Sequence, residues 1–306
     1  NGRFSPARPA PNCPSAVRDE HADARAIFAA GLPPPASAVC RYAAQSTPDF
    51  RTKTLEAFIT DLVSNAAIME EDPFRTLPEP KYYEGRSQAD LQLVDPDYGS
   101  LTPEERHSMT KAVENACLAS GGDKVISVEA GEYDESYEEY VKTSNGLEGS
   151  SRGTFCNVGA SMTAQDEGDR RPAGYNYVGC RYKSDLPPMD EVGAEAARRT
   201  LDLMGGKKIA TTKIPVILEN RGAGRVLNGL VGPMSAGNIQ QKRSFLTEKK
   251  GMQIGSRFLT VIDDPFIPRG LGSRLFDGDG FPARKRNLIS EGVLNEFLVD
   301  WYYSRK

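Results

Sequence analysis

The fold of this chain can be read from residues 214–245, IPVILENRGAGRVLNGLVGPMSAGNIQQKRSF. Ile214–Leu218 is a short apolar run, which predicts a β-strand. A glycine-rich turn follows, and the apolar residues of Val226–Pro233 then predict a helix. The stretch therefore predicts a strand–turn–helix unit, and the function of the chain depends on what that helix carries.

A second informative stretch is the C-terminal run from Leu259 to Lys306. Arg257–Ile262 predicts a strand that ends at Asp263-Asp264-Pro265. Asn287–Ile289 and Val293–Tyr303 predict the two arms of a β-hairpin around the turn residues Glu291-Gly292. This part of the chain is therefore expected to be rich in strands.

Together the two stretches resemble the TldD/PmbA family, whose proteins were once labelled modulators of DNA gyrase. In the active TldD-type members the helix reads His-Glu-x-x-x-His, where the two His bind zinc and the Glu acts as the base. The matching positions here hold Asn228, Gly229 and Pro233. The resemblance covers about residues 41–306 and is specific from Ile214 onward. It implies similarity to the PmbA (TldE) branch, whose members lack the motif.

The three residues at the motif positions also fail on chemical grounds. Catalytic zinc takes three protein ligands and keeps one position for water. The amide oxygen of Asn228 is a poor ligand, Gly229 has no side chain to act as a base, and Pro233 offers neither. The chain contains His21 and His107 and no further histidine, and both are far from this segment in sequence. We therefore expect no catalytic residue at these positions, no bound metal and no cofactor.

Candidate binding residues lie in the glycine-rich block Gly270–Ser273 and in Phe276–Gly280. By resemblance, this block corresponds to a segment near the substrate cleft of the active relatives. Glycine permits close backbone approach, which suits an extended peptide or a subunit edge, although plain loop geometry explains the same residues. The predicted substrate- or partner-binding residues are Asp263, Asp264, Gly270, Gly272, Ser273, Asp277 and Asp279.

The aspartates admit other interpretations. Asp263 and Asp264 resemble an acid–base pair, but Asp is also common in turns at strand ends. Asp277 and Asp279 resemble the start of a calcium loop, yet Phe281 stands where an EF-hand needs a ligand. An alternative function is a metal-dependent hydrolase in which these four aspartates form an oxygen-rich site.

Composition excludes several functional classes. A net charge of −4 and a single short basic cluster, Arg284-Lys285-Arg286, argue against a nucleic-acid surface. No apolar run approaches the roughly 18–20 residues of a membrane span, and no signal-peptide pattern opens the chain. The five cysteines form no Cys-x-x-Cys pair, although Cys156 and Cys180 lie in neighbouring predicted strands and could face each other. We expect a cytoplasmic protein with reduced, buried thiols.

The chain divides into three segments. Residues 1–40 are rich in Pro and Ala and predict a poorly ordered segment, with one short helix as an option near Arg18–Ala30. Residues 41–206 predict an α+β domain, and residues 207–306 predict a β-rich metallopeptidase-like domain. Because the family's sheet continues beyond the point that corresponds to Lys306, we expect the second domain to be incomplete at its C-terminus.

Within the first domain three helices and an antiparallel sheet are expected. Apolar residues at helical spacing predict a helix from Thr52 to about Glu70, and Thr102, Pro103 and Glu105 predict a capping box at the start of the next. A third helix is expected over Asp190–Met204. The predicted strands are Lys124–Ala130, Ser136–Ser144, Gly153–Gln165 and Gly174–Tyr182, with Asn145-Gly146 as a hairpin turn.

The sequence thus predicts an α+β member of a metallopeptidase family that lacks its own zinc site. By resemblance it would be the non-catalytic partner of a TldD-like zinc peptidase that acts on unfolded or leader peptides. Self-association is a second expectation, and a stand-alone peptide-binding protein is a further alternative. No nucleic-acid or membrane partner is expected.

Overall fold

The computed structural model describes residues 24–30 and 41–306 of the 306-residue chain. The chain separates into two compact units, Asn1–Arg75 and Thr76–Lys306, and each is described by itself. Most of the Pro/Ala-rich segment 1–40 lies outside the described residues. Among the residues that are described, no helix is both long and apolar enough to cross a membrane.

The first unit is a small α+β layer. Strand β1 (Ala24–Ala30) pairs antiparallel with β2 (Arg41–Thr47) over seven residues. Helix α1 (Thr52–Ala67) packs on β2, where Leu62 and Ala66 bury against Ala43. The option of a helix near Arg18–Ala30 is therefore wrong for residues 24–30, because pairing with β2 supplies these backbone groups with partners that outweigh the helix preference of alanine.

The second unit begins with an irregular connector and a long helix. The connector contains the short 3₁₀ turns η1 (Pro80–Tyr83) and η2 (Tyr98–Ser100), and helix α2 spans Pro103–Gly121. The predicted capping box is confirmed: the Glu105 backbone N–H donates to Thr102 Oγ1 at 3.2 Å, and the Thr102 N–H donates to Glu105 Oε2 at 2.9 Å. The box satisfies two amide groups that a helix start leaves unpaired.

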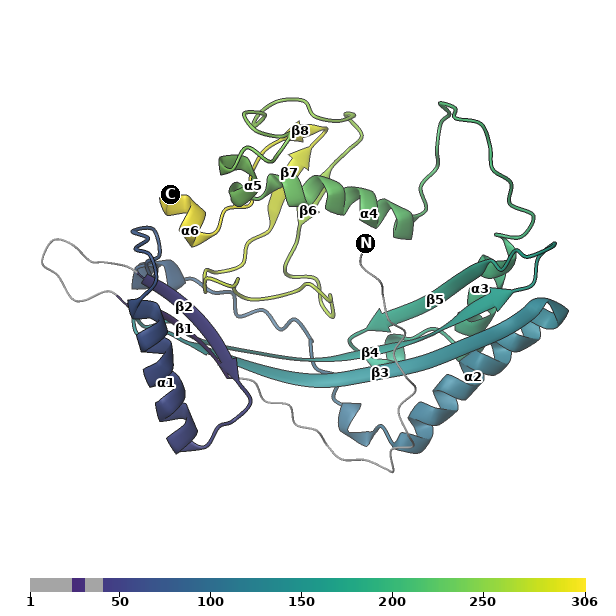
Figure 1. Ribbon diagram of the computed structural model, residues 1–306, viewed down its shortest axis with the longest axis horizontal. Helices are drawn as coiled ribbons and strands as arrows, with labels where there is room; N and C mark the ends of the chain where they lie inside the picture. Colours follow the sequence, from purple (N-terminus) through teal and green to yellow (C-terminus); the bar gives the residue numbers. More distant parts are fainter. Residues whose placement is uncertain (1–23, 31–40) are drawn as a thin grey trace, which may run out of the picture. The chain divides into compact units, whose positions relative to one another are not determined.

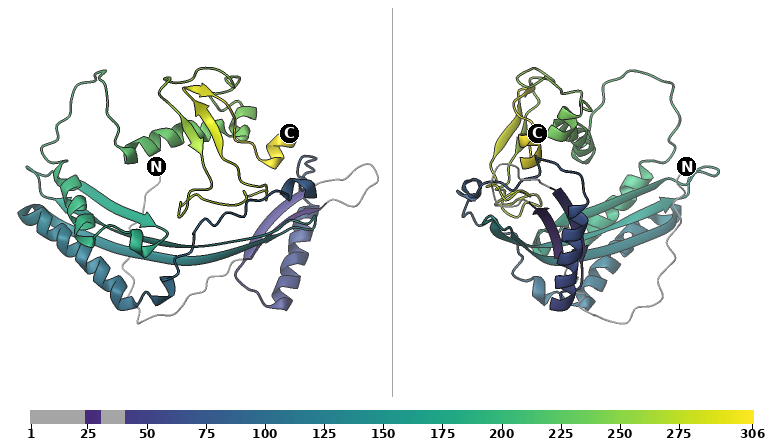
Figure 2. Two further views of the ribbon diagram at one scale, coloured as in Figure 1. Left: turned by 180° about the vertical axis from the view of Figure 1, so that it is seen from behind. Right: turned by 60° about the vertical axis from the view of Figure 1, so that its left-hand side comes forward.

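A three-stranded antiparallel sheet forms the middle of this unit. Its order is β3 (Val125–Lys142), β4 (Glu148–Ala164) and β5 (Ala173–Cys180), and the turns η3 (Gly122–Lys124) and η4 (Lys183–Asp185) flank it. The two strands predicted over residues 124–144 are one strand, because β4 pairs with β3 along its whole length, as Figure 2 shows. The hairpin turn at Asn145-Gly146 is confirmed, with Gly146 at φ 97°.

Helices α2 and α3 (Met189–Leu201) cover one face of this sheet (Figure 1). The predicted third helix is confirmed, although it ends three residues before Met204. Both helices share one core with the even-numbered residues of β4. Its fully buried members are Val113, Cys117, Val158, Ala160, Met162, Ala164, Val192, Ala196 and Ala197.

The C-terminal part carries a second, smaller core. Its elements are α4 (Asn220–Val231), η5 (Gly232–Met234), α5 (Ala236–Gln240), β6 (Val261–Asp263), β7 (Arg286–Ser290), β8 (Val293–Leu294) and α6 (Trp301–Arg305). Strands β6, β7 and β8 form one antiparallel sheet, and Met234, Leu246, Leu288, Ile289 and Leu294 are buried around it.

Two local expectations for this part need correction. The hairpin around Glu291-Gly292 is confirmed, but its second arm stops at Leu294, and Trp301–Tyr303 belong to α6. Asp300 begins that helix by accepting the Tyr303 backbone N–H at 2.7 Å, which favours a helix over an extended arm. The strand predicted over Arg257–Ile262 is confined to Val261–Asp263.

Candidate functional site

The segment that resembles the zinc-binding helix is α4 together with η5. The helix predicted over Val226–Pro233 is confirmed, and Pro233 lies in the 3₁₀ turn where the α-helix has already ended. The strand predicted over Ile214–Leu218 is wrong, because these residues pair with no strand among those described. Pro215 also removes one of the N–H groups that a ladder needs.

The motif positions on α4 are open and chemically weak. Asn228 and Gly229 are exposed, and Pro233 is half-buried. A side chain at Gly229 would meet no heavy atom within 4 Å, so the glycine is not needed for close packing. Asn228 offers one amide group for hydrogen bonding. Gly229 and Pro233 have no side-chain group that could act as a base or as a strong metal ligand.

Helix α4 is held against the sheet through polar contacts. Arg221 Nη2 donates to the Tyr177 carbonyl O at 3.2 Å, and Arg225 Nη2 donates to the Tyr175 hydroxyl at 3.1 Å. At its start, Glu219 pairs with Arg199 of α3 at 2.6 Å. No residue of α4 is fully buried, and of its apolar side chains Leu230 packs against the C-terminal core while Val226 and Leu227 are exposed.

Asp263 and Asp264 both form ion pairs. Asp263 Oδ2 lies 2.8 Å from Arg286 Nη2 and 3.3 Å from Arg274 Nη2. Asp264 pairs with Lys285 Nζ at 2.6 Å and also accepts the Phe266 backbone N–H. The hydrogen bond from Lys285 holds the pKa of Asp264 below its usual value. These ion pairs tie Asp263 and Asp264 to Lys285 and Arg286 and so join the two ends of the segment between them.

Asp277 and Asp279 organise backbone. Asp277 Oδ1 accepts the N–H groups of Asp279 and Phe281, both at 3.0 Å, which closes a tight turn. Asp279 Oδ2 accepts the Trp301 N–H at 2.8 Å, at the start of α6. Burial raises the pKa of Asp279. The sequence did not reveal this tie between two distant segments.

The glycine-rich block packs onto the central sheet. The Leu271 carbonyl O, between Gly270 and Gly272, accepts a hydrogen bond from Arg181 Nη2 at 2.9 Å. Ser273 is buried, and its Oγ donates to the Ile267 carbonyl O at 2.6 Å. Arg269 pairs with Asp185 at 2.8 Å and lies over the Tyr182 ring. Sequence reasoning missed Arg181 and Arg269. Their partners are 90 and 84 positions away in the chain, respectively, and no local pattern marks such distant contacts.

The four aspartates are not gathered into a metal site. Within residues 24–30 and 41–306, no group of three His, Cys, Asp or Glu side chains is arranged to hold a metal ion. The oxygen-rich site suggested for Asp263, Asp264, Asp277 and Asp279 is therefore not formed, since two of them pair with cations and two cap backbone amides.

The cysteines of the sheet are neighbours, as the sequence suggested. Cys156 of β4 stands opposite Cys180 of β5, and both thiols are free. Burial raises the pKa of each to about 11, so neither is a ready nucleophile at neutral pH.

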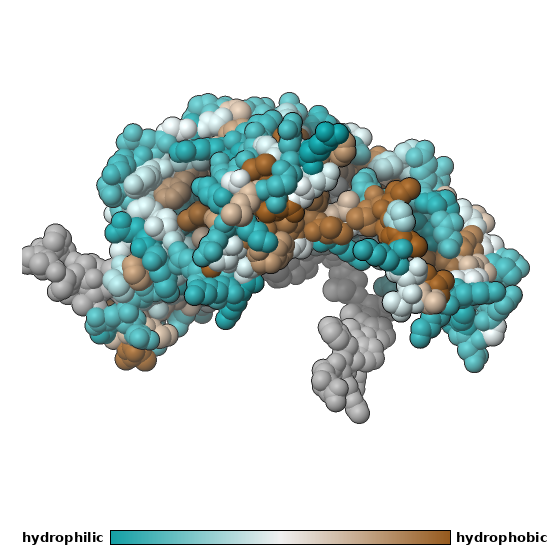
Figure 3. Space-filling view, turned by 90° about the horizontal axis from the view of Figure 1, so that it is seen from above, coloured by the Kyte–Doolittle hydropathy of each residue, from teal (hydrophilic) through white to brown (hydrophobic). Residues whose placement is uncertain are grey.

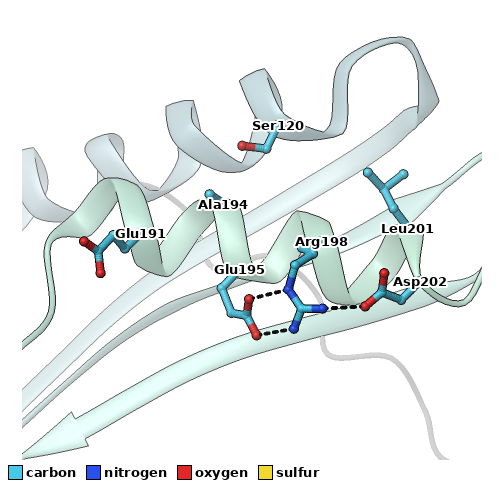
Figure 4. Close-up of a pocket in the computed structure, with 7 residues that line it drawn as sticks. All are labelled: Ser120, Glu191, Ala194, Glu195, Arg198, Leu201 and Asp202. Carbon is cyan, nitrogen blue, oxygen red and sulfur yellow. Dashed lines mark hydrogen bonds and ion pairs between the residues drawn. The ribbon is translucent and has the colours of Figure 1, made fainter.

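A surface hollow between α2 and α3 is lined in part by paired charges (Figure 4). Arg198 of α3 bonds Glu195 at 2.7 Å and Asp202 at 2.6 Å. The Arg198 hydrogen bond lowers the pKa of Glu195 to about 2. The lining residues of the hollow are Ser120, Glu191, Ala194, Glu195, Arg198, Leu201 and Asp202.

Comparisons with known proteins give one consistent result. Residues 96–204 match the PmbA/TldA metallopeptidase central domain, and residues 211–306 match the C-terminal domain of the same family. The metalloprotease PmbA of Escherichia coli O157:H7 is 32% identical over 71% of this chain and 48% of its own length. The chain thus spans about half the length of that curated relative.

Solved structures agree with the sequence matches. A candidate modulator of DNA gyrase from Bacteroides thetaiotaomicron superposes with a TM-score of 0.83 at 31% identity, covering 86% of this chain and 60% of that one. TldE from Thermococcus kodakarensis gives a TM-score of 0.66 at 19% identity over 92% of this chain and 65% of that one, which shows a shared fold.

Proposed function

We propose, given that this chain belongs to the TldD/PmbA metallopeptidase family, that it is a member without a zinc site of its own. In this proposal it is the non-catalytic partner of a zinc-bearing paralogue that acts on unfolded or leader peptides in the cytoplasm. One observation carries the proposal: Asn228, Gly229 and Pro233 stand at the positions where active relatives have two zinc ligands and a catalytic base.

The surface around that helix supports a role in association. Ile217, in the extended segment before α4, is 99% exposed, and Val226 on the helix is 58% exposed. Apolar side chains gather along this face in Figure 3. The exposed members are Ile214, Val216, Ile217, Leu218, Val226 and Leu227. Each would gain roughly 25 cal/mol per Å² on burial, so a partner surface here would be stabilising.

The helix itself also argues for a partner. Helix α4 has twelve residues, none of them buried. Isolated helices shorter than about 12–15 residues are marginal in water, and most helices in proteins are stabilised by packing of an apolar face. A polypeptide that covers Val226 and Leu227 would supply that packing.

The experiment is copurification of the full chain with a zinc-bearing TldD-type paralogue, followed by a binding measurement with two variants. Val226→Asp places a charge on the apolar face and should weaken the complex at least tenfold, about 1.4 kcal/mol. Ile126→Asp is the matched control, because Ile126 is 48% exposed and lies on β3, at the opposite edge of the sheet from the strand β5 that α4 contacts. It should leave affinity unchanged.

Two results would contradict the proposal. A chain that binds no such paralogue and does not change its peptidase rate is not its partner. If that chain still binds unfolded peptides, it is the stand-alone binder. Equal losses in the two variants would show that the face around α4 is not the interface.

A further inference from the structure

A pair of carboxyl groups lies under the start of α2, away from the metallopeptidase helix. Glu132 and Asp134 are two residues apart on β3 and therefore point to the same face of the sheet. Arg106 of α2 binds Asp134 through two nitrogens, Nε at 2.6 Å and Nη2 at 2.7 Å. Arg106 Nη1 also donates to the carbonyl O of Leu101, the residue that ends η2, at 2.7 Å. The carboxylate of Asp134 thus joins the connector and α2 to the sheet.

The second carboxyl of the pair is less well satisfied. Glu132 lies on the same face of β3 as Asp134, and its Oε1 is buried with no hydrogen-bond partner. Two ionised carboxylates have no hydrogen to share, so a hydrogen bond between Glu132 and Asp134 requires a proton on one of the two groups. Arg106 is already committed to Asp134 and to the Leu101 carbonyl O, so it cannot fully neutralise Glu132 as well.

From this geometry we propose that Glu132 and Asp134 share one proton, and that loss of this proton loosens η2 and the first turn of α2 from the sheet. The pair would act as a pH-sensitive latch at the start of the central domain. This inference is independent of the metallopeptidase helix and of any partner subunit.

The surrounding charges agree with this assignment. Burial, followed by the nearby Asp134 charge, raises the pKa of Glu132 to about 7. Burial also acts to raise the pKa of Asp134, but hydrogen bonds from Arg106 and Tyr98 outweigh it and hold that pKa below its usual value. The proton therefore resides on Glu132 and the charge on Asp134.

Apart from Arg106, which is bound to Asp134, the groups on the neighbouring elements named below are thiols and a carboxyl and bring no positive charge. Cys156 of β4 stands opposite Asp134, and Cys180 of β5 stands opposite Cys156. Both thiols are neutral near pH 7, because burial raises their pKa to about 11. The Asp95 carboxylate, from the connector, accepts the backbone N–H groups of Asp97 and Lys183. An ionised Glu132 would add an unpaired negative charge to this cluster.

The direction of the pH effect follows from linkage. Glu132 has a higher pKa in the folded chain than the ordinary value of 4.5, so the folded state holds the proton more tightly. The stability that this provides is fully present below pH 4.5 and is lost as pH rises through about 7. The latch is closed in mild acid and open in mild base.

The test uses the full chain and the substitution Glu132→Gln, which stays neutral and keeps a donor for Asp134. Urea unfolding between pH 5.5 and 8.5 should show wild-type stability falling across this range and the variant nearly constant. At pH 8.5 the folded-to-unfolded ratio of the variant should exceed that of wild type at least tenfold. Glu129→Gln is the matched control, because Glu129 lies on the same strand but is exposed. It should follow the wild type.

A second measurement covers the case in which the variant does not fold. Infrared difference spectra of the wild type should show a protonated carboxyl band that disappears as pH rises from 6 to 8.5. Absence of that band at pH 6, or a Glu132→Gln variant with the pH dependence of wild type, would overturn the proposal.

Discussion

Replacing Gly193 by alanine should destabilise the second unit, although alanine is the better helix former. Gly193 lies on α3 where this helix meets α2. A Cβ there would come within 2.9 Å of both the Ala116 Cβ and the Cys117 backbone N, and still closer to the Val113 carbonyl O. Backbone atoms cannot rotate away, so the two helices would have to separate by on the order of 1 Å in a close-packed interior.

The size of the effect comes from two opposing contributions. Overpacking of a core costs about 1–3 kcal/mol. Alanine regains about 1 kcal/mol over glycine within a helix. Because the nearest contacts are backbone and the core residues Val113 and Cys117 would move with them, the overpacking cost should lie at the upper end, about 3 kcal/mol. Less the gain of about 1 kcal/mol from alanine, this leaves a net loss of about 2 kcal/mol. For a unit of this size, that loss lowers Tm by about 4–8 °C.

The measurement is thermal and urea unfolding followed by circular dichroism, with Gly229→Ala as the control. Gly229 is also in a helix, but a Cβ there meets nothing within 4 Å, so this variant should be neutral or slightly more stable. A Gly193→Ala protein as stable as wild type would refute the close approach of α2 and α3.

Two further predictions concern the termini of helices. Thr102→Ala removes the capping box of α2 and should lower the stability by about 1 kcal/mol. The control Thr110→Ala, in the middle of the same helix, should not lower it. Equal Tm values for Thr102→Ala and wild type would contradict the role of the capping box. Asp279→Ala removes the acceptor for the Trp301 N–H and should expose this single tryptophan, shifting its fluorescence to longer wavelength, while Asp279→Asn keeps an acceptor and the native spectrum. An unchanged spectrum in the alanine variant would show that α6 does not depend on this contact.

The sequence predicted those elements whose signals are local. The capping box at Thr102, the hairpin turn at Asn145-Gly146 and the helix through Asn228 each depend on residues a few positions apart. The resemblance to the family was likewise carried by contiguous stretches. These features need no knowledge of what packs against them.

The errors arose where a distant segment decides the outcome. Strand β3 continues through its polar middle because β4 supplies a partner at each position from Ser127 to Lys142. Ile214–Leu218 fails to become a strand because no described strand pairs with it. The binding candidates around Gly270 are tied to the sheet by Arg181 and Arg269, which no motif marks. Whether they also contact a peptide or a partner remains a prediction.

Zinc content tests the central claim most directly. The full chain, purified, incubated with zinc and dialysed, should retain far less than one zinc per chain and should cleave no unfolded peptide by itself. This follows from Asn228, Gly229 and Pro233 at the positions where relatives need two ligands and a base. About one zinc per chain, lost in Asn228→Ala, together with peptide cleavage, would contradict the account.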